Sequence, residues 1–497
     1  MKRAITLTIL AAILITAASC GGTQDEKPTT TAAEGDTTTS EPDDGFVKDE
    51  LPELNYNGDE VRWFCGDYAS AYFDDIYAEN QNGSLVNDAV YNARLSVEER
   101  LKIKLSVERY EFVWANVPEY NSLIKSMIMS GDTTYDAYIG YTLVPLIIEG
   151  GCFSDLADNK YLDLEKPWWN QDCRNLMPGN SVWFVTGDAT MSLIKHSLCV
   201  YFNQNLLDSC GVTDNMYDIV RNGKWTLDKL EAIIKDTYSD LNGNSASDNE
   251  DRFGLTFGDE NKLRMVSAAL DVNMYTKTKD GYDMTFISER TNDVFTRMQK
   301  LITANENVRQ ALYNDPNGDS FMSFGGNSVS KIFTSGNSLF TASLVGDAAT
   351  VLDNSKFTVG MIPFPKYDES QDNYYTAAQR FAHIYIPSTV TGEQNDRAGA
   401  VLEAWASECY RSVMPTYFET SLKTRYSNDN DMAEMFDLLR KNTKVEFGTV
   451  FYSQLALNCD TFKKLNDSSY NFTSESESLR SKTETQLGEL ITALTGK

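Results

Sequence analysis

The order of strand and helix patterns in residues 61–139 restricts the fold of this chain more than any other feature. Three runs are strand-like: the apolar run 61–65, the run 103–107 in which apolar and polar residues alternate, and the run 135–139. Helix patterns over residues 87–101 and 120–129 separate them, and Asn87 can act as the first N-cap. The apolar positions of the first helix are Val90, Ala93, Val97 and Leu101. This order predicts an α/β fold, with a parallel sheet covered by helices on both faces.

A second set of the same patterns follows Asp188. The runs 198–202, 333–345, 357–362 and 381–386 are strand-like, and residues 204–210 form a short helix pattern that ends at Gly211. Thr226 can cap a further helix, in which Leu227, Leu230 and Ile234 share one face. Two later helix patterns carry Val401, Leu402, Trp405 and Cys409, and then Met432, Met435, Phe436 and Leu439. The sequence therefore predicts two α/β lobes.

The first twenty residues have the order of an export signal. Lys2 and Arg3 precede an apolar run at 5–16, which is too short for a permanent membrane span, and small residues follow at 17–19. With Cys20 behind them, they resemble a bacterial lipoprotein signal, which implies that Cys20 is lipidated. The alternative is an ordinary cleaved signal. We expect residues 21–50, which are rich in Thr, Asp, Glu, Gly and Pro, to form a disordered tether. The predicted location is the extracellular face of the cell membrane, held by the lipid.

The charge balance excludes some partners. The chain has 44 basic and 72 acidic residues, a net charge of −28, which argues against nucleic acid and against an anionic bilayer. We therefore expect contact with the membrane through the lipid anchor only. Only two histidines are present, His196 and His383, which counts against zinc hydrolases and Ser-His-Asp enzymes. We interpret both as structural.

The cysteines predict no metal site or disulfide framework. Seven of the eight cysteines follow Cys20, at irregular spacing and without a C-x-x-C motif. Because seven is odd, at least one thiol stays free, and no particular pair is predicted.

Residues 240–251, DLNGNSASDNED, have the oxygen spacing of an EF-hand-type calcium loop. Side-chain oxygens fall at loop positions 1, 3, 5, 9 and 12, and a carbonyl at position 7. The predicted ligands are Asp240, Asn242, Asn244, Ala246, Asp248 and Asp251. Ser245 replaces the glycine that favours positive φ at position 6, and Asp251 replaces a longer glutamate. The loop predicts a possible structural calcium; the alternative is an acidic turn without an ion.

Six segments between about residues 55 and 452 are informative through their order and spacing. They are NDAVY at 87–91, KPWWN at 166–170, VYFN at 200–203, GKWTLD at 223–228, FxxGxxLF at 333–340 and IPFPKYD at 362–368. Together they resemble a known family, the extracellular solute-binding lipoproteins of ABC importers (family 1, carbohydrate-type). The resemblance implies a periplasmic-binding-protein-like fold of two lobes, joined by a hinge, that close on a ligand. We assign residues 51–187 to the first lobe and 188–380 to the second. Residues 381–497 are a return segment with helices contributing to both.

A sugar site needs flat aromatic rings together with carboxylate or amide groups. Trp168 and Trp169 lie between the predicted lobes and fit this role, although either could equally pack in the core. Other candidates follow the ends of predicted strands, where open α/β sheets bind ligands. They are Asp67 and Tyr68 after the first strand, Tyr141 after the third, and Asp188 at the crossing between the lobes, with Arg380 before a later strand.

We therefore expect a monomeric receptor that captures a small solute, a sugar or an oligosaccharide, and delivers it to the permease subunits of an ABC importer. No catalytic residue is predicted, because G-x-S-x-G, P-loop and H-E-x-x-H motifs are absent. Two alternatives remain open. One is a surface glycoside hydrolase or lyase with a carboxylate pair that forms only in space. The other is a sensor or adhesin with the same fold but no transport role.

Overall fold

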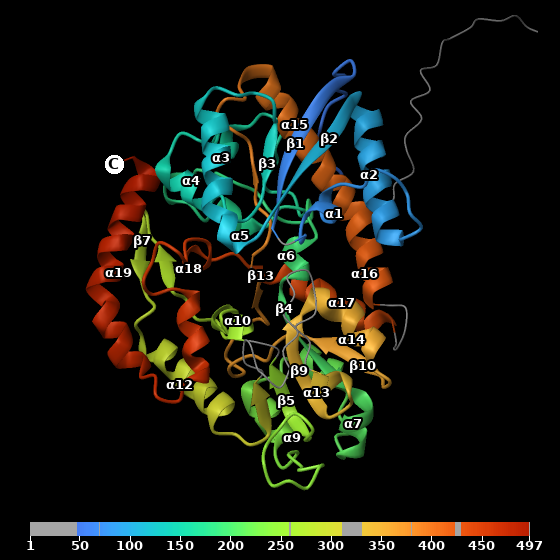
Figure 1. The fold of residues 1–497 in the computed structure, drawn as a ribbon, viewed down its shortest axis with the longest axis vertical. Coiled ribbons are helices and arrows are strands. Elements are labelled where there is room, and N and C mark those ends of the chain that lie inside the picture. The colour runs from blue at the N-terminus through green and yellow to red at the C-terminus, as the bar shows by residue number, and fades with distance from the viewer. Residues whose placement is uncertain are drawn as a thin grey trace, which may run out of the picture. The chain divides into compact units, whose positions relative to one another are not determined.

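The computed structural model describes residues 47–68, 70–257, 260–310, 331–378, 380–422 and 429–496 (Figure 1). Val47–Lys497 form one compact unit. The predicted signal, Cys20 and most of the predicted tether lie outside the described residues. Among the helices of the described residues, none is both long and apolar enough to cross a membrane.

The first lobe is built on a four-stranded sheet with the order β12-β3-β1-β2. Its strands are β1 (Asp59–Tyr68), β2 (Ile103–Phe112), β3 (Ala137–Ile139) and β12 (Ile384–Tyr385). β1 runs parallel to β2 and to β3, which confirms the β-α-β-α-β order that the sequence predicts. β12 pairs antiparallel with β3, so the chain returns to the first lobe after it has built the second.

Helices cover both faces of this sheet (Figure 1). They are α1 (Phe73–Ile76), α2 (Leu85–Leu101), α3 (Val117–Met129), α4 (Val144–Glu149), α5 (Gln171–Arg174) and α15 (Gly392–Glu408). Neighbouring residues of a strand point to opposite faces. Trp63 of β1 therefore packs against Trp405 of α15, with ring centroids 5.8 Å apart, whereas Phe64 stacks on Tyr120 of α3 at 6.4 Å.

The predicted face of α2 is confirmed, but its predicted cap is wrong. Val90, Ala93, Val97 and Leu101 are its buried residues. Ser84 is the N-cap residue, and Asn87 lies in the first turn, where its amide donates to the carbonyl of Asn80 at 3.0 Å. An asparagine near a helix start can bond to the chain before the helix instead of capping it.

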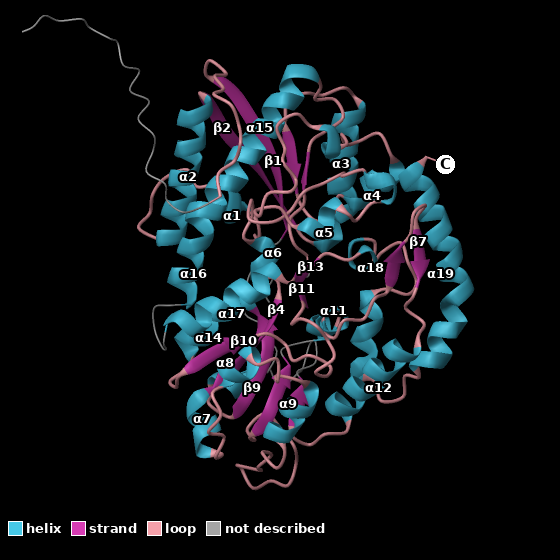
Figure 2. Ribbon diagram, turned by 180° about the vertical axis from the view of Figure 1, so that it is seen from behind, coloured by secondary structure: helices cyan, strands magenta, loops and turns pink. Residues whose placement is uncertain are grey.

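The second lobe has a five-stranded mixed sheet with the order β10-β4-β9-β5-β8 (Figure 2). The strands are β4 (Leu198–Asn203), β5 (Phe253–Phe257), β8 (Val308–Gln310), β9 (Ser338–Leu344) and β10 (Val359–Ile362). β5 is parallel to β8 and β9, whereas β4 is antiparallel to β9 and β10. The strand predicted over residues 333–345 is wrong at its start. Lys331–Thr334 form a helix, α13, and Gly336 at φ +89° turns the chain into β9.

Most helices of this half are short. They are α6 (Ser192–Lys195), α7 (Gln204–Ser209), α8 (Met216–Arg221), α9 (Leu227–Ile234), α10 (Glu260–Leu263), α11 (Val266–Ala269), α14 (Ala348–Asn354), α16 (Met414–Leu422) and α17 (Asp429–Lys441). Thr226 caps α9 by accepting from the backbone N–H of Lys229, and α9 buries its three predicted apolar residues. α15 continues into α16 through a π-helical turn, Cys409–Val413.

A further group of elements lies beside both lobes and has no counterpart in the sequence prediction. It contains the hairpin of β6 (Tyr275–Lys277) and β7 (Tyr282–Met284), with α12 (Glu289–Thr303), α18 (Phe447–Val450), a 3₁₀ helix (Cys459–Asn466) and α19 (Phe472–Thr495). Four phenylalanine rings join its parts at centroid distances of 5.0 to 6.2 Å: Phe286, Phe295, Phe462 and Phe472. We call this group the C-terminal region.

The chain crosses between the two sheets in neighbouring strands. Val185 forms a bridge with Ile384, and Ser197 forms one with Ala378. A third segment joins them, because β11 (Thr376–Ala377) pairs with β13 (Thr443–Lys444). No disulfide reinforces the described part of the chain: all seven of its cysteines are free, and only Cys210 is exposed.

Candidate functional site

The two predicted tryptophans lie in the core. Trp168 is fully buried and Trp169 is 3% exposed, so neither ring offers a face to a solute in this structure. The indole N–H of Trp169 donates to Glu403 Oε2 of α15 at 2.9 Å. The other carboxyl oxygen of Glu403 and Trp168 Nε1 are both buried without a hydrogen-bond partner among the described residues. Burial raises the pKa of Glu403 to about 7. The hydrogen bond between Trp169 and Glu403 therefore connects residues 168–169 to α15.

The two predicted carboxylates are already paired. Asp67 is fully buried; its Oδ1 accepts from the backbone N–H of Tyr72 at 2.8 Å, and its Oδ2 pairs with Arg109 at 2.6 Å. Asp188, which is 7% exposed, pairs with Arg440 of α17, whose Nε lies 3.0 Å from Asp188 Oδ1. Burial raises the Asp188 pKa, against the opposite effect of Arg440. Both side chains hold the backbone in place: Asp67 fixes the chain after β1, and Asp188 fixes the first crossing to the second lobe.

Three predicted residues do come together at the end of the first sheet. Tyr68 follows from β1 and Tyr141 from β3, and their rings lie edge to face with centroids 5.3 Å apart. Tyr72, from the same loop, lies 6.2 Å from Tyr141 and donates its hydroxyl to the carbonyl of Arg380. His196 Nδ1 lies 3.0 Å from the same carbonyl. Arg380 has a φ of +56°, an uncommon conformation for a residue with a side chain. First-lobe rings and the second crossing therefore meet here.

Residues that the sequence analysis missed complete this region. Arg264 follows α10 in the second lobe, and its Nη2 pairs with Asp460 Oδ1 at 2.8 Å. The same guanidinium lies 5.6 Å from the ring of Tyr452, which belongs to the C-terminal region. Burial raises the Tyr141 pKa, Arg380 and Arg264 lower it, and Tyr452 raises it further. Charges from separate parts of the chain therefore act on one hydroxyl.

Buried polar atoms without partners occur in several parts of the described chain. Three of them are Tyr141 Oη, Arg264 Nε and Glu446 Oε2, each buried with no hydrogen-bond partner among the described residues. Burial raises the pKa of Glu446 to about 7, and the charges of both Glu446 and Arg264 act on the thiol of Cys459. Buried polar groups are nearly always hydrogen-bonded, so a group of unpaired ones indicates a polar ligand or water. We call Tyr68, Tyr141, Arg264, Arg380, Glu446 and Tyr452 the junction site.

Both histidines are neutral packing residues. His383 stacks on Phe184 at 4.1 Å and lies 2.9 Å from the hydroxyl of Tyr385. Burial lowers the pKa of His196 to about 4 and that of His383 to about 3. Neither is charged near neutral pH.

The predicted calcium loop folds back on its own side chains. Asp240 accepts from the backbone N–H groups of Gly243 at 2.6 Å and Ser245 at 2.8 Å. Ser245 has a φ of +62°, so position 6 takes the conformation for which glycine is usual. Asp248 accepts from the amides of Asn242 and Asn244, and Asp251 from the N–H of Leu241. No group of three or more acidic, histidine or cysteine side chains in the described residues is placed to hold a metal. Ala246, the predicted carbonyl ligand, is exposed in this loop.

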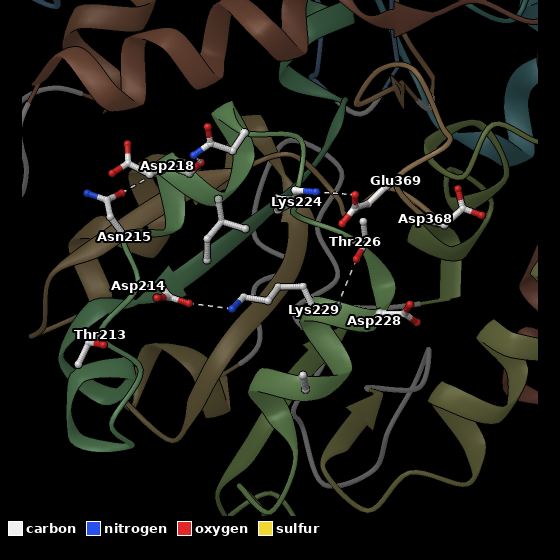
Figure 3. Close-up of a pocket in the computed structure, with 13 residues that line it drawn as sticks. Thr213, Asp214, Asn215, Asp218, Lys224, Thr226, Asp228, Lys229, Asp368 and Glu369 are labelled. Atoms are coloured by element: carbon white, nitrogen blue, oxygen red, sulfur yellow. Dashed lines mark hydrogen bonds and ion pairs between the residues drawn. The ribbon is translucent and has the colours of Figure 1, made fainter.

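An open pocket of about 810 Å³ lies in the second lobe, away from the predicted residues (Figure 3). It is lined by the starts of α8 and α9 and by the loop that carries Asp368 and Glu369. Its lysines already have partners: Lys229 pairs with Asp214 at 2.7 Å and Lys224 with Glu369 at 2.5 Å. Because these lysines are already neutralised by acidic residues of the protein, the pocket is a weaker candidate for a ligand site than the junction site.

No protein-family model matches the sequence, and no curated protein matches it. Solved structures do match. One is the galacto-N-biose/lacto-N-biose I-binding protein of the ABC transporter from Bifidobacterium longum, 12% identical over 87% of this chain and 98% of that chain, with a TM-score of 0.53. The GacH receptor of Streptomyces glaucescens is 10% identical over 87% and 99%, with a TM-score of 0.52. UspC of M. tuberculosis is 13% identical over 86% and 100%, with a TM-score of 0.52.

The chain has the fold of the two-lobed solute-binding proteins. This likeness confirms the fold that the sequence segments imply, an α/β chain of two lobes. Its two sheets and neighbouring crossings provide the parts that such a fold needs. The junction site lies where the first sheet, the second crossing, the second lobe and the C-terminal region meet.

Proposed function

We propose that the protein is a binding receptor of an ABC importer that captures a sugar or an oligosaccharide at the junction site. The observation that carries the proposal is the group of unpaired buried polar atoms beside aromatic rings. Tyr141 Oη, Arg264 Nε and Glu446 Oε2 offer donors and acceptors to hydroxyl groups. Tyr452 offers a ring 5.6 Å from the guanidinium of Arg264. The fold supports the proposal, because two of the similar structures are described with an ABC transporter or as a receptor bound to acarbose.

The proposed mechanism is capture without chemistry. Tyr141 belongs to the first lobe and Arg264 to the second, so a ligand that contacts both stabilises the state in which the lobes are closed. The crossings carry the motion, and the permease recognises the closed state. No bond of the solute is broken, and the protein is not an enzyme.

Thermal unfolding of the chain from Val47 onward tests this function, with a panel of mono-, di- and oligosaccharides and with peptides as controls. A saccharide at about 100 times its Kd adds about 2.7 kcal/mol to the unfolding free energy, which raises Tm. Tyr141→Phe and Glu446→Gln should reduce that shift. Release of reducing sugar during incubation would instead support the glycoside hydrolase, and a panel without any shift would contradict sugar capture.

We also propose lipid anchoring through Cys20, with the protein on the extracellular face. The compact unit begins at the first lobe: Asp49 pairs with Arg100 of α2 at 2.5 Å, and Glu50 with Lys166 at 3.0 Å. Cys20→Ala should release the protein into the medium and abolish labelling by a palmitate analogue. Labelling that persists in this variant would contradict the proposal.

A structural calcium in the 240–251 loop is our third proposal. It is supported by the ligand spacing and by the positive φ of Ser245. Calcium should raise Tm relative to a chelator, and Asp240→Asn should remove that difference, whereas magnesium should have little effect. An equal Tm in calcium and in chelator would favour an acidic turn without an ion.

A further inference from the structure

Trp114 is exposed at the outer end of the first sheet. It opens a 3₁₀ helix, Trp114–Asn116, two residues after the end of β2, and 56% of its surface is accessible. The residue before it, Val113, is 54% exposed. Single exposed apolar residues are common, but an indole presents the largest flat apolar face of any side chain.

The sheet topology places Trp114 at the same edge of the sheet as Tyr68 of the junction site. β1 and β2 are parallel and Tyr68 is level with Phe112, so Trp114 lies beyond Tyr68 at the same edge. The strand order β3-β1-β2 places Tyr141, Tyr68 and Phe112 side by side, with centroid distances of 5.3 and 5.5 Å. The three inner rings are 4% to 8% exposed, whereas Trp114 is open. A row of three aromatic rings therefore runs along this edge of the sheet, and the chain leads from its last ring, Phe112, to the exposed Trp114 two residues later.

The distance from Tyr141 to Trp114 sets a minimum length for a ligand that contacts both residues. Neighbouring strands lie about 4.8 Å apart, so the β3 and β2 ends of the row are separated by about 10 Å across the sheet. Trp114 is two residues beyond Phe112, so its Cα lies at most about 7 Å from that of Phe112. A single pyranose ring cannot reach both Tyr141 and Trp114, but a linear chain of several rings can.

We propose that Trp114 is the outer stacking platform of the ligand site, so that the receptor takes oligosaccharides of three or more units in preference to free monosaccharides. The inference rests on the proposed function. The inner unit occupies the junction site, where its hydroxyls meet the unpaired polar atoms, and an outer unit lies on the indole. Trp114 is then a specificity-determining residue that selects for length.

Calorimetric titration with malto-, cello- and xylo-oligosaccharides of one to five units tests the inference, with wild type, Trp114→Ala and Trp114→Phe. In the series that binds, wild-type affinity should rise with length up to about four units. Trp114→Ala should weaken the tetrasaccharide about tenfold, which is about 1.4 kcal/mol, and leave the disaccharide unchanged. Trp114→Phe should restore part of the loss.

Met129→Ala is the matched control. Met129 is 65% exposed on the same lobe but lies at the far end of α3, so its removal should change no affinity. Equal binding of the tetrasaccharide by wild type and Trp114→Ala would overturn the inference, and so would tightest binding of a monosaccharide. If wild type binds no saccharide in the panel, the proposed function itself fails. Saccharide binding that does not depend on Trp114 would instead overturn this inference alone, so the two failures can be told apart.

Discussion

The protonation state of one buried side chain, Glu403, affects the stability of the protein. Glu403 is 1% exposed, it accepts from the indole of Trp169, and no cation is paired with it among the described residues. Because burial favours the neutral form, its pKa rises from an ordinary value of 4.5 to about 7. The folded protein therefore holds a proton on Glu403 over a pH range in which the unfolded chain has released it.

We expect Glu403→Gln to change the pH dependence of stability. A carboxyl with a raised folded pKa contributes stability that is fully present below pH 4.5 and is lost as the pH rises through about 7. Glutamine does not titrate, so the unfolding free energy of the variant should rise relative to that of wild type by about 2 to 3 kcal/mol between pH 5 and pH 8. Urea unfolding at both pH values measures this. Glu393→Gln, on the exposed start of the same helix, should show no such gain.

The candidate residues also show where sequence reasoning stops. Tyr68 and Tyr141 could be predicted to meet, because the ends of parallel strands share an edge. The burial of Trp168 and Trp169 could not, since it depends on a carboxyl more than 230 residues later. The position of Asp67 after a strand and that of Asp188 at the lobe crossing both favour a ligand contact, but the arginines that pair with them are remote in sequence. Arg264, Glu446 and Tyr452 lacked any local signal.

At the scale of elements, periodicity predicted best where a strand or helix packs against its neighbours in sequence. β1, α2, β2, α3 and β3 all appear where expected. The start of the strand predicted at 333 was wrong because a short apolar run fits a buried helix turn equally well. Phe333 packs against Phe357 from that helix, with centroids 5.5 Å apart.

The first crossing depends on a glycine. Gly187 has a φ of +145°, and a Cβ there would lie 2.1 Å from the carbonyl oxygen of Trp168. Gly187→Ala should therefore lower the unfolding free energy by about 3 kcal/mol or more, because strain and a backbone clash add. Gly179→Ala is the matched control: it has a left-handed conformation, with φ +76° and ψ 6°, but nothing lies within 4 Å of an added Cβ. The control substitution should lower the unfolding free energy by about 1 kcal/mol. If both variants lost the same amount, the backbone must have moved to relieve the clash at residue 187.

At the scale of the whole molecule, a large core replaces covalent cross-links. A chain of this length buries most of its apolar surface, so disulfides are not required for stability. The C-terminal region adds to this core through its four phenylalanines, which lie between residues 286 and 472. Contacts at such separation leave no periodic pattern in the sequence, which explains why two lobes were predicted but this third group of elements was not.

Thiol titration should confirm the absence of cross-links. The chain from Val47 onward contains seven cysteines, of which only Cys210 is exposed. We expect one rapid equivalent of thiol in the native protein and seven after denaturation, with Tm unchanged by a reducing agent. Cys210→Ser should remove the rapid equivalent alone. Fewer than seven thiols after denaturation would reveal a disulfide.

The ion pairs at the start of the compact unit determine how a mechanical load enters the protein. Asp49 is held by Arg100 and Glu50 by Lys166, and all four residues lie within the first lobe. A pull on the chain at Val47 is therefore borne by α2 and the segment before Trp168, and it does not pass through the crossings. The second lobe is therefore connected to the point of pull only through the first lobe.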